Sequence, residues 1–138
     1  MNRLRLFAMM ILAALLLAAC APGSPTGAAD PTGVEWKLVE INGKPALAGS
    51  NVTLTFEDGK GGGKGGCNSY GGSYRIQGGS LSFSDLFQTE MACMDPAGVM
   101  DQETEYLQTL GQAAGYQISG ERLELKNAAG ETVLVFQK

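Results

Sequence analysis

The sequence offers few side chains that could carry out covalent chemistry. It contains three cysteines, Cys20, Cys67 and Cys93, and it has no histidine. Imidazole is the commonest general base and metal ligand in proteins, so its absence excludes Ser-His-Asp and Cys-His catalytic sets. Two cysteines without a histidine also do not favour a zinc site. We therefore expect a protein that is not an enzyme and that needs neither a metal nor a cofactor.

The glycine-rich stretch Gly59–Tyr74, "GKGGGKGGCNSYGGSY", is the second place where chemistry could occur. Gly61, Gly63 and Gly66 satisfy the G-x-G-x-x-G pattern, but a strand and not a helix is expected to follow, so no helix N-terminus faces a phosphate. A Walker loop needs Ser or Thr directly after its Gly-Lys pair, but Lys60 and Lys64 are each followed by glycine, which excludes this motif. We interpret Gly59–Gly65 as a flexible loop between antiparallel strands.

The N-terminal residues have the pattern of an export signal. Two arginines precede fourteen residues without a polar side chain, Leu6–Ala19. This run is shorter than the roughly 20 residues that span a bilayer, and it has the length of a signal-peptide core. It ends in "LAAC", which resembles the bacterial lipobox, with cleavage between Ala19 and Cys20 and acylation of Cys20. An ordinary secretory signal, cut near Ala19 or Ala21, is the alternative.

These features predict three parts: a signal peptide (1–19), a lipidated cysteine with a Pro/Gly-rich tether (20–33) and a folded domain (34–138). Fatty-acyl chains such as palmitate would anchor the chain to a membrane. Because Ala and not Asp follows Cys20, we expect the periplasmic side of an outer membrane in a cell with two membranes. In a cell with one membrane, we expect its outer face.

Removing the two signal arginines leaves 8 of 10 basic and all 14 acidic residues, which argues against nucleic acid as a partner.

Cys67 and Cys93 form an even pair after export, which favours a disulfide in an oxidising compartment. The bond would close a loop of 25 intervening residues and contribute roughly 3 kcal/mol. Two buried thiols or a reactive thiol remain alternatives. A thiol redox protein would need a nearby cation to lower the thiol pKa, and Lys64 is the only candidate close in sequence.

The elements that must position these residues are short strands and one helix. Alternating apolar residues predict strands near Val34–Leu38 and Val52–Glu57. A turn at Gly78–Gly79 would pair Ile76 with Leu81, and Tyr74 with Phe83. A second hairpin would pair Tyr116 and Ile118 with Leu125 and Leu123. Glu131–Gln137 is apolar on both faces, so it is expected to be a central strand or a strand covered by the helix. We expect a mainly β fold: a small antiparallel barrel-like sheet of about seven to eight strands with one helix packed against it.

The helix is predicted over Pro96–Gln112, with Asp95 as its N-cap. Its apolar face would consist of Met100, Glu103, Leu107, Leu110 and Ala114. Glu103 is the unusual member, since a buried carboxylate needs hydrogen bonds or a cation, and Arg75 or Arg122 could supply the cation. A single buried carboxylate is not a catalytic pair, so we interpret Glu103 as structural.

The domain resembles a known family along most of its length. Segments such as "VEWKLVEINGKP", "GCNSYGGSY", "FQTEMAC" and "VLVF" are similar to the META domain, the domain of the heat-shock-linked HslJ lipoproteins. The residues that carry the resemblance are Trp36, Gly66, Cys67, Asn68, Tyr70, Thr89, Met91, Cys93, Glu103 and Leu107. The glycine run before Gly66 is longer than is usual in that family.

The resemblance implies a small antiparallel sheet with a packed helix, and a role in stress or envelope integrity rather than a known reaction. We therefore expect a monomeric, membrane-tethered binding module with an envelope protein or a small apolar ligand as its partner. A redox protein, or a hydrolase inhibitor that presents the Cys67- and Cys93-bearing loops, is the alternative.

Overall fold

The computed structural model describes residues 29–138, which form one antiparallel sheet and one helix. Ala19 and Cys20 lie outside the described residues, as do the predicted signal peptide and most of the predicted tether. Among the described residues, no helix is long and apolar enough to cross a bilayer. The elements are β1 (Trp36–Ile41), β2 (Lys44–Pro45), β3 (Thr53–Glu57), β4 (Lys60–Lys64), β5 (Ser69–Gln77), β6 (Ser80–Gln88), α2 (Val99–Gly111), β7 (Gly115–Ser119), β8 (Arg122–Lys126) and β9 (Thr132–Gln137).

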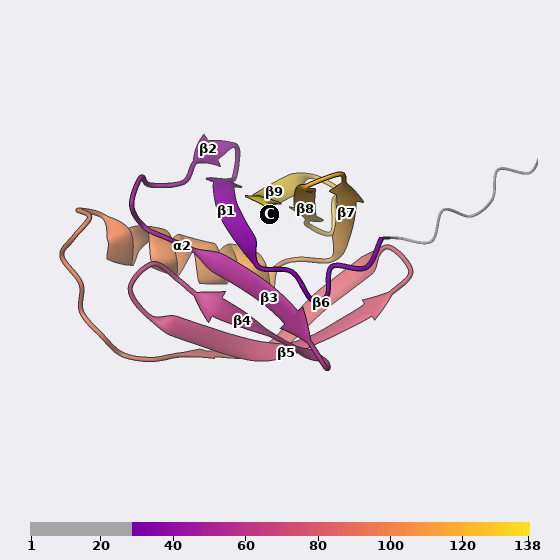
Figure 1. Cartoon of the computed structure of the whole chain (residues 1–138), viewed down its shortest axis with the longest axis horizontal. Coiled ribbons are helices and arrows are strands. Elements are labelled where there is room, and N and C mark those ends of the chain that lie inside the picture. The colour runs from indigo at the N-terminus through magenta and orange to yellow at the C-terminus, as the bar shows by residue number, and fades with distance from the viewer. Residues whose placement is uncertain (1–28) are drawn as a thin grey trace, which may run out of the picture.

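The sheet closes on itself into a ring (Figure 1). Its strands follow the order β2-β1-β3-β4-β5-β6-β7-β8-β9, and an additional pairing of β1 with β9 joins the two ends. This confirms the predicted mainly β fold with an antiparallel sheet and one packed helix, although the sheet has nine strands. The short β2 stays outside the ring, paired only with the end of β1.

The ring has one weak junction, between β6 and β7. These two strands share a single residue pair, Ser80 with Gly115, whereas β5 and β6 pair along most of their lengths. Helix α2 packs against β6, β1 and β9. The interior is occupied by fully buried side chains from both sheet and helix: Trp36, Leu54, Phe56, Leu81, Tyr106, Leu110, Leu123, Leu125, Leu134 and Phe136.

The register of both predicted hairpins is confirmed. Ile76 pairs with Leu81 across the Gly78–Gly79 turn, as the two-residue turn requires. In the C-terminal hairpin, Ile118 pairs with Leu123. Strand β9 pairs with both β8 and β1, which confirms its predicted central position.

The interpretation of Gly59–Gly65 as a flexible loop is wrong, because its middle is strand β4. This strand lies inside the sheet, paired with β3 on one side and with β5 on the other. Glycine disfavours strands because it has no side chain to pack, but here the neighbours occupy that space. A methyl group on Gly61 would lie 2.7 Å from the Phe83 ring, and one on Gly62 would lie 2.6 Å from the Tyr70 carbonyl oxygen.

The predicted start and face of the helix also need correction. Asp95 does not cap it and Pro96 precedes it: the N-cap is Gly98, whose φ of 86° lies outside the helical range. Ala114 lies beyond the helix and is exposed, and Met100 is only half-buried. The buried face consists of Val99, Glu103, Tyr106, Thr109 and Leu110. It is therefore rotated from the predicted apolar stripe toward Tyr106, which enters the ring.

The first described residues pack against the domain. Pro31 is buried, and its carbonyl oxygen accepts a hydrogen bond of 2.9 Å from the indole N–H of Trp36. This bond satisfies the one polar group of a fully buried Trp36.

Candidate functional site

A buried carboxylate organises one end of the molecule. Glu103 is 1% exposed, and its two oxygens accept three hydrogen bonds from the segment that follows the glycine run. Oε2 accepts the backbone N–H groups of Cys67 (3.0 Å) and Asn68 (2.6 Å), while Oε1 accepts the side-chain amide of Asn68 (2.6 Å). Two consecutive backbone N–H groups thus converge on one oxygen, an arrangement that suits a negative charge.

Two glycines make this approach of the backbone to Glu103 possible. A methyl group on Gly65 would lie 2.6 Å from Oε2 of Glu103, so any other residue would displace the carboxylate. Gly66 has a φ of 122°, which side chains disfavour, and turns the chain so that the next two N–H groups face inward.

Asn68 extends the carboxylate's contacts to the loop after β6. Its side-chain oxygen accepts the N–H of Met91 (2.7 Å) and the hydroxyl of Thr89 (2.8 Å). Its side-chain nitrogen also donates to the carbonyl oxygen of Met91 (3.2 Å). We call Glu103, Cys67, Asn68, Thr89 and Met91 the brace, because their hydrogen bonds tie together the helix, the turn before β5 and the loop after β6.

The predicted disulfide between Cys67 and Cys93 is confirmed, with their Cα atoms 5.8 Å apart. It ties the loop to the brace by a covalent bond, and the sulfur of Cys67 lies 3.6 Å from the carbonyl oxygen of Met91. The loop from Thr89 to Cys93 is therefore held by hydrogen bonds at its start and by the disulfide at its end.

Two buried tyrosines, Tyr70 on β5 and Tyr106 on α2, form a pair close to the brace. The hydroxyl of Tyr70 donates to the carbonyl oxygen of Thr53 (2.8 Å) and lies 2.6 Å from the hydroxyl of Tyr106. Since a hydroxyl has one proton, Tyr106 donates to Tyr70. Burial raises the pKa of Tyr70, partly opposed by its bond to Tyr106. Burial also raises the pKa of Tyr106, and the neighbouring Tyr70 raises it further.

Neither proposed arginine partners Glu103. Arg122 instead forms an ion pair with Glu124 (2.9 Å), and this hydrogen bond lowers the pKa of Glu124. Arg75 is exposed on β5. The sequence led us to expect a cation next to Glu103. Two of the carboxylate's partners are instead backbone N–H groups, and the identity of a residue does not show where its backbone N–H points. The consecutive glycines at 65 and 66 were the available signal.

The structure brings most of the predicted motif residues together. Gly66, Cys93 and the brace residues meet at one end of the molecule. Tyr70 follows Asn68 by two residues, and its hydroxyl contacts that of Tyr106, three residues after Glu103. Trp36 does not join them, since it lies in the ring's interior and bonds to Pro31. Leu107 is also apart: it lines a groove between α2 and β6.

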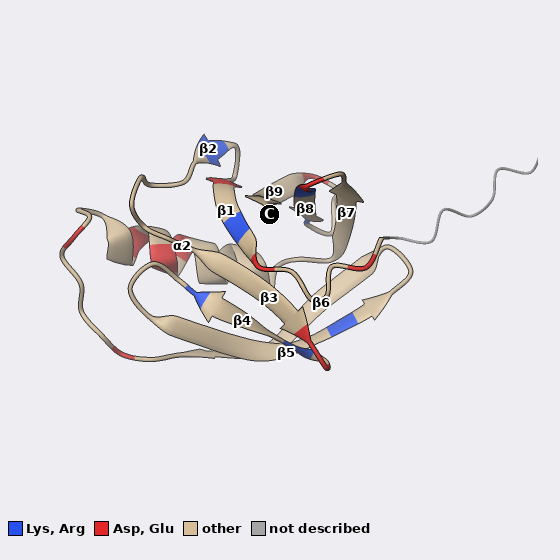
Figure 2. Ribbon diagram, viewed as in Figure 1, with Lys and Arg blue, Asp and Glu red and all other residues tan. Residues whose placement is uncertain are grey.

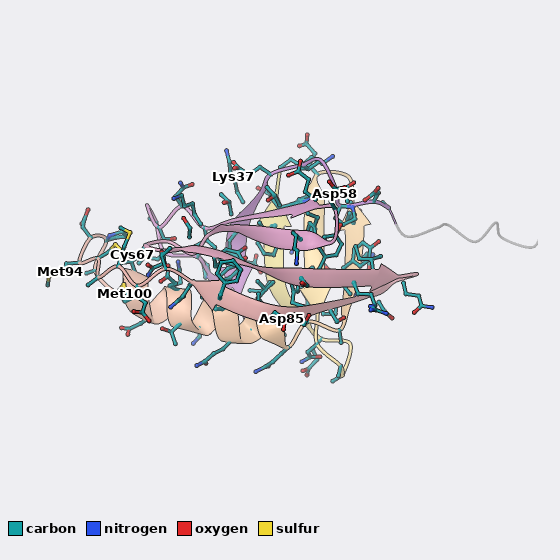
Figure 3. All side chains as sticks on the ribbon, turned by 90° about the horizontal axis from the view of Figure 1, so that it is seen from below. Lys37, Asp58, Cys67, Asp85, Met94 and Met100 are labelled. Carbon is teal, nitrogen blue, oxygen red and sulfur yellow. A yellow bond between two sulfur atoms is a disulfide. The ribbon has the colours of Figure 1, made fainter. Side chains whose placement is uncertain are left out.

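The brace holds the most exposed apolar surface of the domain. Among residues 29–138, the exposed large apolar side chains are Phe87 (68%), Met91 (57%) and Met94 (92%). All three fall within Phe87–Met94, which we call the apolar segment. Figure 3 shows Met94 at the same end of the molecule as Cys67. Large apolar side chains gathered on one exposed segment indicate an interaction surface.

The loop and the helix next to this segment carry charges of one sign, whereas β4, on the other side, carries Lys60 and Lys64. Between Arg75 and Arg122 the sequence has seven acidic residues and no lysine or arginine. Figure 2 shows acidic but no basic residues on α2 and on the loop that leads into it. Glu103 is the buried member of this set, and exposed Glu90, Asp95 and Asp101 give the loop and the start of α2 a negative potential.

The described residues contain no group of three or more His, Cys, Asp or Glu side chains that could hold a metal ion. What the geometry provides is an apolar segment that is held by hydrogen bonds and a disulfide next to an acidic helix. The fold and this site define a small β-ring domain that presents a braced loop.

The chain belongs to the META domain family, whose model matches residues 29–138. Solved structures share the fold. One protein from Burkholderia xenovorans is 29% identical, with a TM-score of 0.60, and the match covers 86% of this chain and 97% of that one. A DUF4847 family protein from Bacteroides vulgatus is 16% identical, with a TM-score of 0.59 and coverage of 78% and 93%. A search among curated proteins found no match.

Proposed function

We propose that this protein is a non-enzymatic, membrane-anchored envelope lipoprotein whose META domain binds a partner through the apolar segment. The observation that carries the proposal is the gathering of Phe87, Met91 and Met94 on one segment that is held by both a disulfide and the brace. Methionine side chains adapt to irregular apolar surfaces, which suits a contact surface. Fixing the loop in advance lowers the entropy cost of binding.

The envelope location rests on the sequence of the N-terminal part. The apolar run ending in "LAAC" and the Pro/Gly-rich segment after it fit a lipid anchor on Cys20 followed by a tether. The disulfide is consistent with an exported domain, because such bonds persist in oxidising compartments. Membership of the META domain family supports an envelope-related domain, and our proposal of a stress-related role of the HslJ kind rests on the resemblance of the sequence motifs.

The anchor is tested by growing cells with labelled palmitate. Wild-type protein is expected to carry the label and to sediment with membranes, and Cys20→Ser is expected to lose both properties. Label on the Cys20→Ser protein, or its absence from the wild type, would contradict the anchor.

The binding role is tested by retrieving partners from envelope extracts with purified protein. The test variant carries Phe87→Ser, Met91→Ser and Met94→Ser, and the matched control carries Gln117→Ser at an exposed position on β7. We expect wild type and control to retain the same partner and the triple variant to lose it. Equal retention by all three proteins would show that the apolar segment is not the contact surface.

A further inference from the structure

Strand β6 has a free edge along most of its length. On one side it pairs with β5, but on the other only Ser80 has a strand partner, Gly115 of β7. On that second side, the residues from Ser82 to Gln88 have no strand partner in the described part of the chain. A strand edge without a partner presents backbone N–H and C=O groups that a further strand can bind.

The hydrogen bonds at the two ends of β6 show which backbone groups face the free side. The N–H of Leu81 donates to the carbonyl oxygen of Ala114 and so points away from β5. Backbone direction alternates along a strand, so Phe83 points the same way. The N–H of Thr89 donates to Ser69, on the β5 side, and Gln88 therefore faces outward. A bulge at Asp85 (φ 55°) divides the edge into two short stretches.

A groove of about 300 Å³ lies beside this edge. One wall is β6, with Leu86, Phe87 and Gln88, and the other is α2, with Thr104, Leu107 and Gln108. Leu86 and Leu107 are half-buried, which gives the groove an apolar floor. Figure 3 shows that β6 runs beside α2, and a methyl group on Gly111 would lie 3.6 Å from Leu86. A strand edge next to a helix is a geometry that binds extended peptides.

The charge of the surroundings selects the kind of peptide. Exposed Asp85, Glu90, Asp95 and Asp101 belong to the two elements and the loop that border the groove, and no basic residue lies among them. A second copy of this chain would bring an equally acidic edge and would be repelled. A peptide with lysine or arginine beside its apolar residues complements both the charge and the groove.

We propose that the groove between β6 and α2 binds an extended cationic peptide segment, which adds as a strand to the free edge of β6. This rests on the proposed binding function and names the chemistry of its partner. The bulge at Asp85 limits the added strand to a few residues, which disfavours pairing with long strands. Phe87 belongs to both the groove and the apolar segment, so a bound peptide would continue onto that segment.

The test uses the mature protein and two synthetic decapeptides. The first alternates lysine with valine or leucine, and the second has glutamate in place of each lysine. We expect calorimetric binding of the first peptide, weakened by salt, and none of the second. On binding, hydrogen exchange at the N–H groups of Phe83 and Gln88 should slow at least tenfold, while residues of β8 should not change.

Gln88→Pro removes an outward-facing N–H, and Gln88→Ala removes the same side chain but keeps that N–H. We expect Gln88→Ala to bind the cationic peptide like the wild type and Gln88→Pro to bind about 3- to 10-fold more weakly, as the loss of one hydrogen bond predicts. The exchange measurement on wild-type protein keeps the test valid if Gln88→Pro folds poorly.

Three outcomes would overturn the inference. Protection confined to Met91 and Met94 would place the peptide on the apolar segment, so strand addition would be wrong and the binding function would stand. Edge protection that grows with protein concentration in the absence of peptide would show self-pairing. Equal binding of both peptides, or of neither at millimolar concentration, would show that the partner is not cationic; the proposed function is then judged by the extract experiment alone.

Discussion

Replacing Glu103 with alanine removes the acceptor of three hydrogen bonds that hold the brace. Two of these bonds are fully buried, the ones from the backbone and side-chain nitrogens of Asn68. The third donor, the N–H of Cys67, is part-buried and can reach water. A hydrogen bond to a charged group is worth about 1.5–3 kcal/mol, so two lost bonds predict a destabilisation of about 3–6 kcal/mol.

Glu103→Gln should cost less, about 2–3 kcal/mol. Its amide keeps one oxygen as an acceptor but places an NH₂ group against a second donor. Rotating Asn68 cannot relieve this contact, because its oxygen already accepts from Met91 and Thr89. Glu105→Gln is the matched control: Glu105 lies two residues further along the helix and accepts one exposed bond from Asn42. It should change stability by less than about 0.5 kcal/mol.

Urea unfolding of the oxidised mature proteins, followed by circular dichroism, measures these free energies. The reasoning predicts the order Glu105→Gln, Glu103→Gln, Glu103→Ala, from the smallest loss to the largest. A loss below about 1 kcal/mol for Glu103→Ala would refute the argument that this carboxylate holds the loop.

Three further results are expected. Reducing the disulfide should lower the unfolding free energy by about 3 kcal/mol, and thiol titration of the denatured, unreduced protein should find no free thiol on the domain; two thiols would contradict the bond. Burial raises the pKa values of Tyr70 and Tyr106, so the folded state keeps protons that the unfolded chain releases near pH 10. The free energy of unfolding should therefore be constant below pH 10 and fall above it. A urea midpoint that does not change from pH 8 to 11.5 would contradict this. Gly63→Ala should destabilise by at least about 2 kcal/mol, because its methyl group would overlap the carbonyl oxygen of Thr53, whereas Gly79→Ala has open space and should be near neutral; equal thermal stabilities would disprove the argument.

The hairpins could be predicted from sequence because local chemistry decides them. A two-residue turn at Gly78–Gly79 leaves only one register that puts Ile76 and Leu81 on the same face, and the structure has it. Strand β4 could not be predicted, because its glycines carry no pattern of their own. The reason for them lies in residues distant in sequence, such as Phe83, that occupy the space of the missing side chains.

The site shows the same division. The sequence identified Glu103 as an anomaly on a helix face and Cys67 with Cys93 as a pair. It could not show that Asn68 would connect them, because that link depends on the distance between α2 and the glycine turn. The N-cap was misplaced because a good local signal, Asp95–Pro96, was overridden by the left-handed Gly98 that follows it.

The central claim is that this domain works by contact through the apolar segment. Its most direct test places a photo-crosslinking amino acid at Met94, the most exposed large apolar residue of those described, or at Gln117 on β7, in cells that export the protein. We predict a crosslinked species of defined mass from position 94 and none from position 117. Equal crosslinking from both positions, or none from position 94, would contradict the claim.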